Sequence, residues 1–401
     1  MLPLLQGLRI LDLTTVILGP YGTQILGDMG AEVIKVEPPE GDSMRPVAPL
    51  AAPGLSAIFS NFNRNKRSVA LDLKSEGGKA ALRKLLPTAD VFVHNMRQEA
   101  MDKLGFTFKT VREANPRIIY AAAVGFGRHG RYAGKPAYDD VIQAASGFAG
   151  LFQMRDGTPL YAPSIVADKI SGLHLAYAVM AALLYRERTG NVPGYVEVPM
   201  FELMAAFSLS EHMSAATFEE NGKVGYVRVI SPSRRPYKTK DGWVGVLPYS
   251  ERNWTKILVE IGRADVAEFD WFKNPTERSR RIDELYEILA AAMVHRTTAE
   301  WLATFERLDI PSQPVRLPND LLQDPHLLDV GFFEANFAGE TPVVRGLRQA
   351  VNVEAVDSAR DLAPPLLGAD TADVLREAGC SEDEIAAARP SRSEQKVTRQ
   401  L

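Results

Sequence analysis

Short apolar stretches alternate with helix-length segments through the first 190 residues. Leu8–Leu13 and Glu32–Glu37 have the hydrophobic density of buried strands, and the segment 19–29 between them has helical character. A strand, a helix and a second strand within about 30 residues form a βαβ unit, which requires parallel pairing through a right-handed crossover. The alternation continues with strands at 68–73, 91–94 and 118–122 and a helix at 77–86. Residues 1 to about 190 therefore predict an α/β layer around a mostly parallel sheet.

Two strongly apolar segments come next. Residues 170–185 are apolar on all sides of the helix they predict, which is typical of a helix buried among other elements. The segment is shorter than the ~20 residues that a bilayer span requires, and it contains His174, so we expect no membrane-spanning helix. Residues 200–209 predict a second buried helix. Two such helices indicate a large core.

The pattern changes after about Glu220. Residues 236–246 predict a hairpin that turns at Asp241-Gly242, a strong turn pair. Helical periodicity follows at 254–261, 281–295 and 298–308, so this region predicts a second, smaller α/β domain. Residues 364–387 are rich in helical signal, and the polar residues 390–401 predict a frayed tail.

Charge and composition exclude several classes of function. The 401 residues include 46 Lys and Arg against 50 Asp and Glu, a net charge of −4, which gives no basic footprint for nucleic acid or anionic membrane. The single cysteine, Cys380, excludes a disulfide framework and a cysteine-based zinc site. The six histidines lack His-x-x-x-His spacing, so we expect no metal site. The N-terminus shows no signal peptide, and we expect a cytoplasmic protein.

Glycines 19, 22, 27 and 30 in the first strand–helix unit, with Glu37 at the end of the next strand, imitate a dinucleotide-binding fold. The Gly-x-Gly-x-x-Gly signature is absent from the turn, so the glycines indicate turns and helix packing, and NAD is not expected.

Asp168 lies where the most apolar helix begins. A carboxylate there faces unpaired N–H groups and the positive end of the helix dipole, and we expect these to hold it ionised. Aspartate is also a preferred helix cap, so a structural role stays open at this point. An ionised, partly desolvated carboxylate can alternatively act as a nucleophile without a general base.

Several separated blocks, in their order along the chain, resemble the class III CoA-transferases (CaiB/BaiF family), which include formyl-CoA transferase and carnitine CoA-transferase. The blocks are Leu8–Thr14 with Gly19-Pro-Tyr21, Gly30–Pro39, Asn63–Lys74, Val93-His-Asn95, Tyr138-Asp139, Asp168-x-x-x-Gly172 and Pro364-Pro-Leu-Leu-Gly368. The resemblance covers nearly the whole chain. It implies a Rossmann-like large domain built from both chain ends (1–220 and 331–401), a smaller domain between them (221–330), and an interlocked homodimer.

The resemblance also implies a reaction. The Asp168 carboxylate attacks the thioester of an acyl-CoA, and CoA passes to a carboxylic acid through an aspartyl anhydride and an aspartyl-CoA thioester. An unperturbed aspartate has a pKa of ~3.9, so we expect the nucleophile to be charged at neutral pH. Succinyl-CoA is the expected donor and a dicarboxylic acid the expected acceptor. No tightly bound cofactor is expected, and CoA itself is a substrate.

Residues that contact CoA are implied position by position. Val16 matches a residue near the thioester arm, Leu71 and Lys74 match positions at the adenine and a phosphate, and Tyr138 matches a tyrosine near the pantetheine. The other matching positions are Asn95, Met96, Ala100, Lys103, Lys135 and Met200. Lys103 stands where the family often has arginine, and lysine supplies charge but no planar fork.

The sequence also departs from the formyl-CoA branch. Ile17 stands where that branch has glutamine, and residues 229–236 lack its run of glycines, so formyl-CoA and oxalate are not the expected substrates. Arg234 and Arg235 in this segment are candidates for holding the second carboxylate of a dicarboxylic acid. The main alternative is α-methylacyl-CoA racemase, whose Gly-His-Asp motif is here Ala-Tyr138-Asp139 and lacks the imidazole for α-proton transfer. A CoA-binding protein without activity and a thioesterase are the remaining alternatives.

Overall fold

The computed structural model describes residues 1–334, 346–354, 356 and 361–388. The chain forms two compact units. Unit 1 comprises residues 1–146, 161–207 and those described in 329–401, and unit 2 comprises residues 147–160 and 208–328. The domain limits expected from the sequence, at 220 and 330, stay a prediction. The predicted tail at 390–401 lies outside the described residues.

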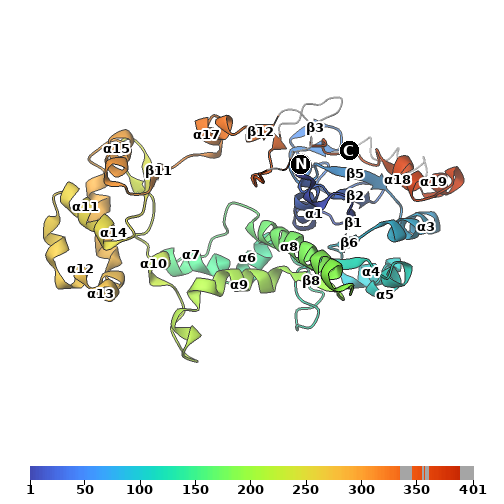
Figure 1. Ribbon diagram of the computed structural model, residues 1–401. Helices are drawn as coiled ribbons and strands as arrows, with labels where there is room; N and C mark the ends of the chain where they lie inside the picture. The colour runs from blue at the N-terminus through green and yellow to red at the C-terminus, as the bar shows by residue number, and fades with distance from the viewer. Residues whose placement is uncertain (335–345, 355, 357–360, 389–401) are drawn as a thin grey trace. The chain divides into compact units, whose positions relative to one another are not determined.

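Unit 1 is built on a six-stranded sheet in which every neighbouring pair is parallel (Figure 1). In spatial order the strands are β5 (Lys66–Ala70), β2 (Glu32–Glu37), β1 (Arg9–Leu13), β6 (Val91–His94), β7 (Ile119–Val124) and β8 (Val196–Pro199). The chain runs outward from β1 through β2 to β5, then returns to β6 and runs outward in the other direction. The strand order therefore reverses between β1 and β6, and ligands of such sheets bind beyond the carboxyl ends of the strands at that point.

The prediction of a mostly parallel α/β layer is confirmed. The predicted strands at 8–13, 32–37, 91–94 and 118–122 correspond to β1, β2, β6 and β7. The strand predicted at 68–73 is instead β5, two residues earlier at its start and three earlier at its end. Strand β5 ends before Leu71 because the chain turns there into the next helix. Ser75 caps that helix, and its N–H and hydroxyl both donate to the Asp72 carbonyl oxygen. The strand starts early because the charged Lys66 has buried partners.

Helices and small ribbons complete unit 1. They are η1 (Pro3–Leu5), α1 (Leu18–Asp28), β3 (Leu50–Ala52), β4 (Leu55–Ser56), α2 (Ala57–Phe62), α3 (Glu76–Leu85), η2 (Leu86–Thr88), α4 (Gln98–Leu104), α5 (Phe108–Ala114), α6 (Asp139–Ala145), α8 (Val166–Thr189), β12 (Phe333–Glu334), β13 (Gly346–Leu347), α18 (Thr371–Glu377) and α19 (Glu382–Ala388). Helix α9 (Met200–His212) begins in unit 1 and ends in unit 2. The helices predicted near the C-terminus are α18 and α19, and their Val374, Leu375 and Ile385 join the core around β1, β2 and β6.

The N-terminal ends of α1 and α8 cross at two glycines. A Cβ on Gly172 would lie 2.8 Å from the carbonyl oxygen of Leu18, and a Cβ on Gly22 would lie 2.8 Å from the carbonyl oxygen of Gly172. Gly22 also faces Leu175, one turn further along α8, so the two helices run in the same direction through the contact. Residues that precede Gly172 on α8 therefore lie toward the end of α1 that follows strand β1.

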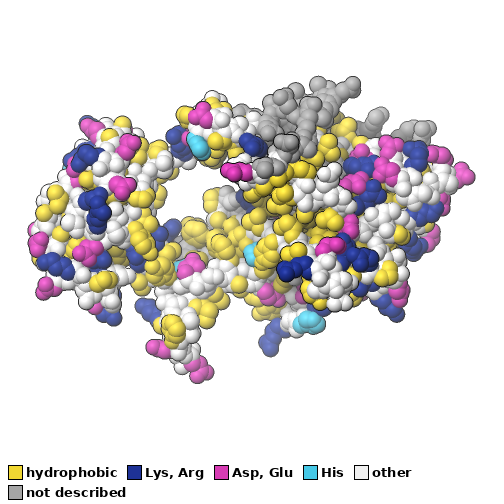
Figure 2. Space-filling view, viewed as in Figure 1, with side chains coloured by type: hydrophobic (Ala, Val, Ile, Leu, Met, Phe, Trp, Pro, Cys, Tyr) yellow, Lys and Arg dark blue, Asp and Glu magenta, His cyan; other side chains and the backbone are white. Residues whose placement is uncertain are grey.

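Helix α8 is longer than the predicted 170–185, so its length does not exclude a membrane span. It is the one described helix that is long and apolar enough to cross a bilayer, and 44% of its most apolar stretch lies buried within the fold. It packs on α1, α6, β7 and β8, as a core helix does. Its other face carries an exposed apolar stripe with spacings of four, four and three residues, formed by Leu173, Tyr177, Ala181 and Leu184. Hydrophobic side chains gather on the molecular surface over this helix (Figure 2).

Unit 2 contains a three-stranded antiparallel sheet in the order β11 (Ser312–Pro314), β10 (Trp243–Val246), β9 (Tyr237–Lys238). The hairpin predicted around Asp241-Gly242 is the β9–β10 connection. The helices are α7 (Phe148–Asp156), η3 (Ser214–Thr217), α10 (Val227–Ile230), α11 (Glu251–Glu260), η4 (Ala264–Glu268), α12 (Asp270–Lys273), α13 (Pro275–Arg280), α14 (Ile282–Met293), α15 (Thr298–Leu308), α16 (Pro318–Leu321) and α17 (Pro325–Asp329).

The three predicted helices of this unit are α11, α14 and α15. Capping boxes begin two of them, with Ser250 and Thr297 as the capping residues of α11 and α15. Trp254 and Trp301 from these helices pack with residues of the small sheet in a separate core.

The glycine contact generates a prediction about stability. We expect Gly172→Ala to lower the free energy of unfolding by about 1–2 kcal/mol, because the added methyl group meets a backbone carbonyl that cannot rotate away. This cost outweighs the gain of about 1 kcal/mol that alanine brings to a helix interior. Urea denaturation measures the difference. Gly194→Ala, where a Cβ meets nothing within 4 Å, is the matched control in the same unit. Equal stability of the two variants would contradict the prediction.

Candidate active site

A cavity of about 280 Å³ lies in unit 1 at the carboxyl ends of the strands. Leu13 ends β1, Glu37 ends β2, and Met96 follows β6, so three strands beside the reversal point contribute to its wall. The segment after β5 supplies Leu71 and Lys74. Leu71, Lys74 and Met96, which were predicted to contact CoA, are thus brought together in one cavity. Its wall combines apolar residues with the acidic Glu37, Glu40 and Asp72 and the exposed Lys74.

The loop between β1 and α1 beside this cavity is strained. Val16 has a φ of 71°, which a β-branched residue rarely adopts. Such a conformation costs on the order of 1–3 kcal/mol and persists only where neighbouring groups impose it. Asn95 accepts from the Thr15 N–H at 3.0 Å and donates to the Thr15 carbonyl at 2.7 Å, while Asp42 accepts from the Val16 N–H at 3.3 Å. Asn95, predicted to contact CoA, therefore also fixes the backbone at Val16.

Two buried charged residues also hold the β1–α1 loop in place. Lys35, fully buried in β2, donates to the Thr14 carbonyl at 2.8 Å and pairs with Asp42 at 2.9 Å. Its ammonium therefore ties the loop to the same carboxylate that holds Val16. Neither residue was predicted from the sequence. The available signal for Lys35 was a lysine between Ile34 and Val36 in a strand predicted to be buried.

A second buried pair joins β1 and β5, with Asp12 and Lys66 at 3.1 Å. Burial raises the pKa of Asp12, but the charges of Lys66 and Lys35 and two threonine hydroxyls outweigh it and bring the pKa to about 2. Burial lowers the pKa of Lys66 to about 8, partly offset by Asp12. The pair thus remains ionised at neutral pH.

Asp168 occupies the first turn of α8 and is half-buried. Burial, reinforced by the charge of Asp139, raises the pKa of Asp168 to about 7. The prediction that the helix N-terminus holds this carboxylate ionised is therefore wrong. The reason is that Asp139 itself accepts the Asp168 N–H, at 3.0 Å, while the Asp168 carboxylate has no hydrogen-bond partner among the described residues.

Two residues one turn apart on α6 hold the segment that leads into α8. Asp139 accepts the Asp168 N–H, and Gln143 donates to Asp139. Gln143 also accepts from the Ala162 N–H at 2.9 Å. From the sequence, Asp139 was predicted only as part of a motif, and Gln143 was not predicted. Their i, i+4 spacing at the start of a short helix was the available signal, because it places both side chains on one face.

The other predicted CoA contacts lie at several places in unit 1. Ala100 and Lys103 are on α4, where Lys103 is exposed. Lys135 lies over the Tyr132 ring at 4.3 Å, and Tyr138, just before α6, is 70% exposed. Met200 is buried at the start of α9. None of these residues lines the cavity described above. Within the described parts of the chain, no group of three or more His, Cys, Asp or Glu side chains could hold a metal ion.

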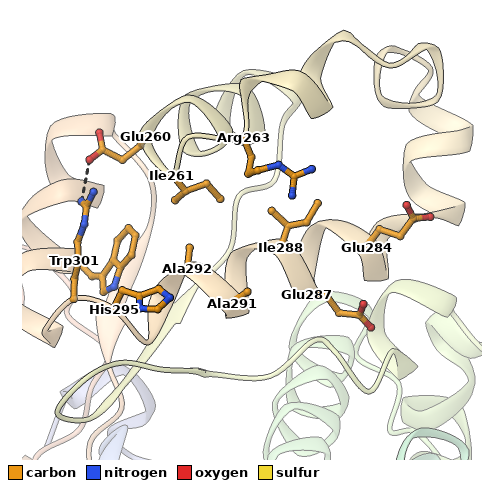
Figure 3. A pocket seen from close by; sticks show the side chains of 11 residues that line it. Glu260, Ile261, Arg263, Glu284, Glu287, Ile288, Ala291, Ala292, His295 and Trp301 are labelled. Carbon is orange, nitrogen blue, oxygen red and sulfur yellow. Dashed lines mark hydrogen bonds and ion pairs between the residues drawn. The ribbon is translucent and has the colours of Figure 1, made fainter.

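Unit 2 has its own hollows. One of about 720 Å³ lies between α11, α14 and α15 (Figure 3). Its charged lining is mixed, and Arg296 is paired with Glu260 at 2.9 Å. A second hollow, of about 460 Å³, is lined by Arg234 and Arg235, the arginines predicted to hold a carboxylate.

Comparison with known proteins identifies the family. Residues 5–371 match the model of CoA-transferase family III. The chain is 34% identical to the probable fatty acyl-CoA transferase Rv3272 of Mycobacterium tuberculosis over 74% of this chain and 79% of that protein. It is 30% identical to the (R)-2-hydroxy-4-methylpentanoate CoA-transferase of Clostridioides difficile over 95% and 97%, and 29% identical to the succinate–glutarate CoA-transferase of Agrobacterium fabrum over 94% and 96%.

Superposition on solved structures identifies the same family. A crystal structure of a mutant of Rv3272 superposes with a TM-score of 0.81 at 28% identity, covering 92% of this chain and 98% of that one. A CaiB/BaiF family protein from Brucella suis superposes with a TM-score of 0.80 at 27% identity, over 94% and 100%. The resemblance stated from the sequence blocks is thereby confirmed, and the chain belongs to CoA-transferase family III and is a CoA-transferase.

Proposed function

We propose that this enzyme moves CoA from an acyl-CoA to a free carboxylic acid through covalent intermediates on Asp168. The observation that carries the proposal is the state of this carboxylate. It lies in the first turn of a core helix, its pKa is raised to about 7 by burial and by Asp139, and it has no partner among the described residues. A carboxylate without a stabilising partner is a stronger nucleophile than a solvated or salt-bridged one.

The reaction balances without an added acid or base. An Asp168 oxygen attacks the thioester carbonyl, the C–S bond breaks, and an acyl-aspartyl anhydride and the CoA thiolate result. The thiolate attacks the aspartyl carbonyl, which releases the donor acid and leaves an aspartyl-CoA thioester. The acceptor carboxylate attacks the carbonyl of that thioester, the C–S bond breaks, and an acceptor–aspartyl anhydride and the thiolate result. The thiolate then attacks the acceptor's acyl carbon, which breaks the anhydride and frees the Asp168 carboxylate. Exclusion of water preserves the energy of the thioester through these steps.

The cavity at the carboxyl ends of the strands is the proposed site for part of CoA. Leu71 and Met96 offer apolar contact to a flat ring such as adenine, and the exposed ammonium of Lys74 suits a phosphate. Val16, held by Asn95, is the proposed contact to the thioester arm. The parallel crossing of α1 and α8 supports this assignment, because it brings the first turn of α8 toward the β1–α1 loop.

Succinyl-CoA is the proposed donor. The relative from Agrobacterium fabrum named for succinate and glutarate supports a dicarboxylic substrate. α-Methylacyl-CoA racemase is not favoured, because Tyr138 precedes Asp139 where a racemase has histidine and the reported curated relatives are named as transferases.

We also propose that two subunits form an interlocked homodimer. The exposed apolar stripe of α8 supports an interface, because a surface stripe of this kind on a core helix is typical of a contact with another chain. Leu173, Tyr177 and Leu184 on this stripe are each about half exposed in the single chain.

Transfer through Asp168 predicts a loss of activity that mass spectrometry can follow. With succinyl-CoA and a pool of carboxylic acids, the wild-type protein should form new acyl-CoA species, and Asp168→Ala should form them more slowly by at least roughly 10³-fold. Asp140→Asn, which changes an exposed acid on α6, is the control and should retain activity. Exchange that persists in Asp168→Ala would overturn the aspartyl mechanism.

The raised pKa predicts a pH dependence. Because the nucleophile must be ionised, kcat/KM should rise with pH through a midpoint of about 7. Asp139→Asn removes a negative charge that raises the pKa of Asp168, so the midpoint should move to lower pH while remaining above the ordinary aspartate value, since burial persists. The asparagine oxygen can still accept the Asp168 N–H. A midpoint that is unchanged or higher in Asp139→Asn, with Asp140→Asn for comparison, would contradict this assignment.

The dimer proposal predicts twice the mass of the chain by light scattering. If the subunits are interlocked, two separately labelled batches of the dimer should not exchange subunits unless the protein is unfolded and refolded. Chains threaded through each other cannot separate while they are folded. Tyr177→Glu should weaken assembly, since it places a charge on the apolar stripe. Rapid exchange under native conditions would retain the dimer but exclude interlocking.

A further inference from the structure

The short segment 37–42 of unit 1 joins the cavity wall to the β1–α1 loop. Residues 37–40 line the cavity at the carboxyl ends of the strands. Two residues further on, Asp42 accepts the Val16 N–H at 3.3 Å and the Met44 N–H at 2.9 Å through the same carboxylate oxygen. One stretch of backbone therefore contacts both the proposed site for the base of CoA and the loop proposed to contact the thioester arm.

The end of this segment at the cavity is fixed by Glu37. Its buried carboxylate accepts the Asp42 N–H at 3.0 Å, the Arg45 guanidinium at 2.7 and 2.6 Å, and the Ser68 hydroxyl at 2.7 Å. Burial raises the pKa of Glu37, but Arg45, Lys35 and Ser68 outweigh it and bring the pKa below its ordinary value. Glu37 is therefore ionised at neutral pH and holds the backbone of Asp42 in one orientation.

The Asp42 carboxylate is held by Lys35 of β2. Both side chains are fully buried, and the ammonium lies 2.9 Å from the carboxylate. Burial lowers the pKa of Lys35, but Asp12, Asp42 and Glu37 raise it above its ordinary value, so the pair is charged on the lysine side at neutral pH. Lys35 also donates to the Thr14 carbonyl at 2.8 Å. The pair thus holds the loop at two points, at Thr14 through the lysine and at Val16 through the aspartate.

A turn between β1 and α1 does not by itself require this arrangement. A glycine at position 16 would adopt a φ of 71° without steric cost, whereas valine in that conformation costs on the order of 1–3 kcal/mol. A buried ion pair is seldom better for stability than apolar residues of the same volume. Strain of this kind, imposed by surrounding groups, is concentrated at functional sites.

We propose that the Lys35–Asp42 pair is a positioning element for CoA transfer. It holds Val16 in its strained conformation, so that the thioester arm is presented to Asp168 in one orientation. The proposal rests on the proposed function, in which the arm contacts Val16. Neither Lys35 nor Asp42 touches the reacting atoms, but a displacement of about 1 Å at such a contact can lower the rate by ~10²-fold.

Asp42→Asn separates positioning from binding. The amide nitrogen of asparagine cannot pair with the Lys35 ammonium, so kcat with succinyl-CoA should fall at least about 10-fold. Adenosine 3′,5′-bisphosphate, which represents only the nucleotide part of CoA, should bind within about 2-fold of wild type by calorimetry, because the variant leaves Leu71, Lys74 and Met96 in place. A wild-type kcat in Asp42→Asn would overturn the proposal.

Asp28→Asn is the matched control, since it makes the same change at another buried, ion-paired aspartate of unit 1. Asp28 pairs with Arg64 at the far end of α1, about 15 Å along the helix from the β1–α1 loop. It should lower the free energy of unfolding and leave kcat within about 2-fold of wild type. An equal loss of kcat in Asp28→Asn and Asp42→Asn would show general destabilisation and exclude a positioning role.

A double variant guards against misfolding. Lys35→Met/Asp42→Asn leaves no unpaired buried charge at this site, so the protein should remain folded. Its kcat should still be at least about 10-fold below wild type, because the Thr14 carbonyl has lost its donor. Wild-type kcat in this folded variant would contradict the proposal.

A double-mutant cycle with Val16→Gly gives a signature that a purely structural pair would not produce. Because glycine adopts a φ of 71° without being held, Asp42→Asn should lower kcat at least about 3-fold less in the Val16→Gly background than in the wild type. Independent effects of the two substitutions would overturn the proposal. If Asp168→Ala abolishes transfer while Asp42→Asn is fully active, the proposed function stands and the positioning role is wrong. If the wild type transfers no CoA, both fail together.

Discussion

The close approach of α1 and α8 places the candidate nucleophile relative to the strained loop. Without side chains at Gly22 and Gly172, the two backbones approach so closely that a single methyl group would meet a carbonyl oxygen. Asp168 precedes Gly172 by one helical turn, and Val16 precedes α1 by two residues. The spacing Asp-x-x-x-Gly therefore has a physical explanation. The glycine lets α8 pack closely against α1, and the aspartate one turn earlier then lies toward the N-terminal end of α1, which follows β1.

Burial raises the pKa of Asp168 more than the helix dipole lowers it, because a second carboxylate lies beside it. The first-turn N–H that could have stabilised Asp168 is occupied by Asp139, so the dipole benefits the neighbour. The raised pKa of Asp168 also makes the stability of the fold depend on pH. Because the pKa of Asp168 is about 7 in the folded state and near 3.8 in an unfolded chain, its contribution to stability is complete below pH 4 and is lost as pH rises through 7. The fold thus tolerates a destabilised anion at neutral pH, as functional sites do.

The sequence predicted most of the sheet and the helices because their signals are local. Apolar strands separated by helix-length segments identify β1, β2, β6 and β7, and Asp241-Gly242 marks the hairpin of unit 2. The pKa of Asp168 could not be obtained this way, because it depends on Asp139, which lies 29 residues away on another helix. The strain at Val16 was equally hidden, since it is imposed by Asn95, 80 residues distant from the Thr15 backbone that it holds.

Pairing of charges distinguishes structural from available cations in this chain. The buried lysines of the large sheet, Lys35 in β2 and Lys66 at the start of β5, are matched by Asp42 and Asp12. The arginines of the hollow in Figure 3 are matched by carboxylates of their own unit. By contrast, Lys74, Arg234 and Arg235 have no ion pair among the described residues, so their charges are available to an anion from solution.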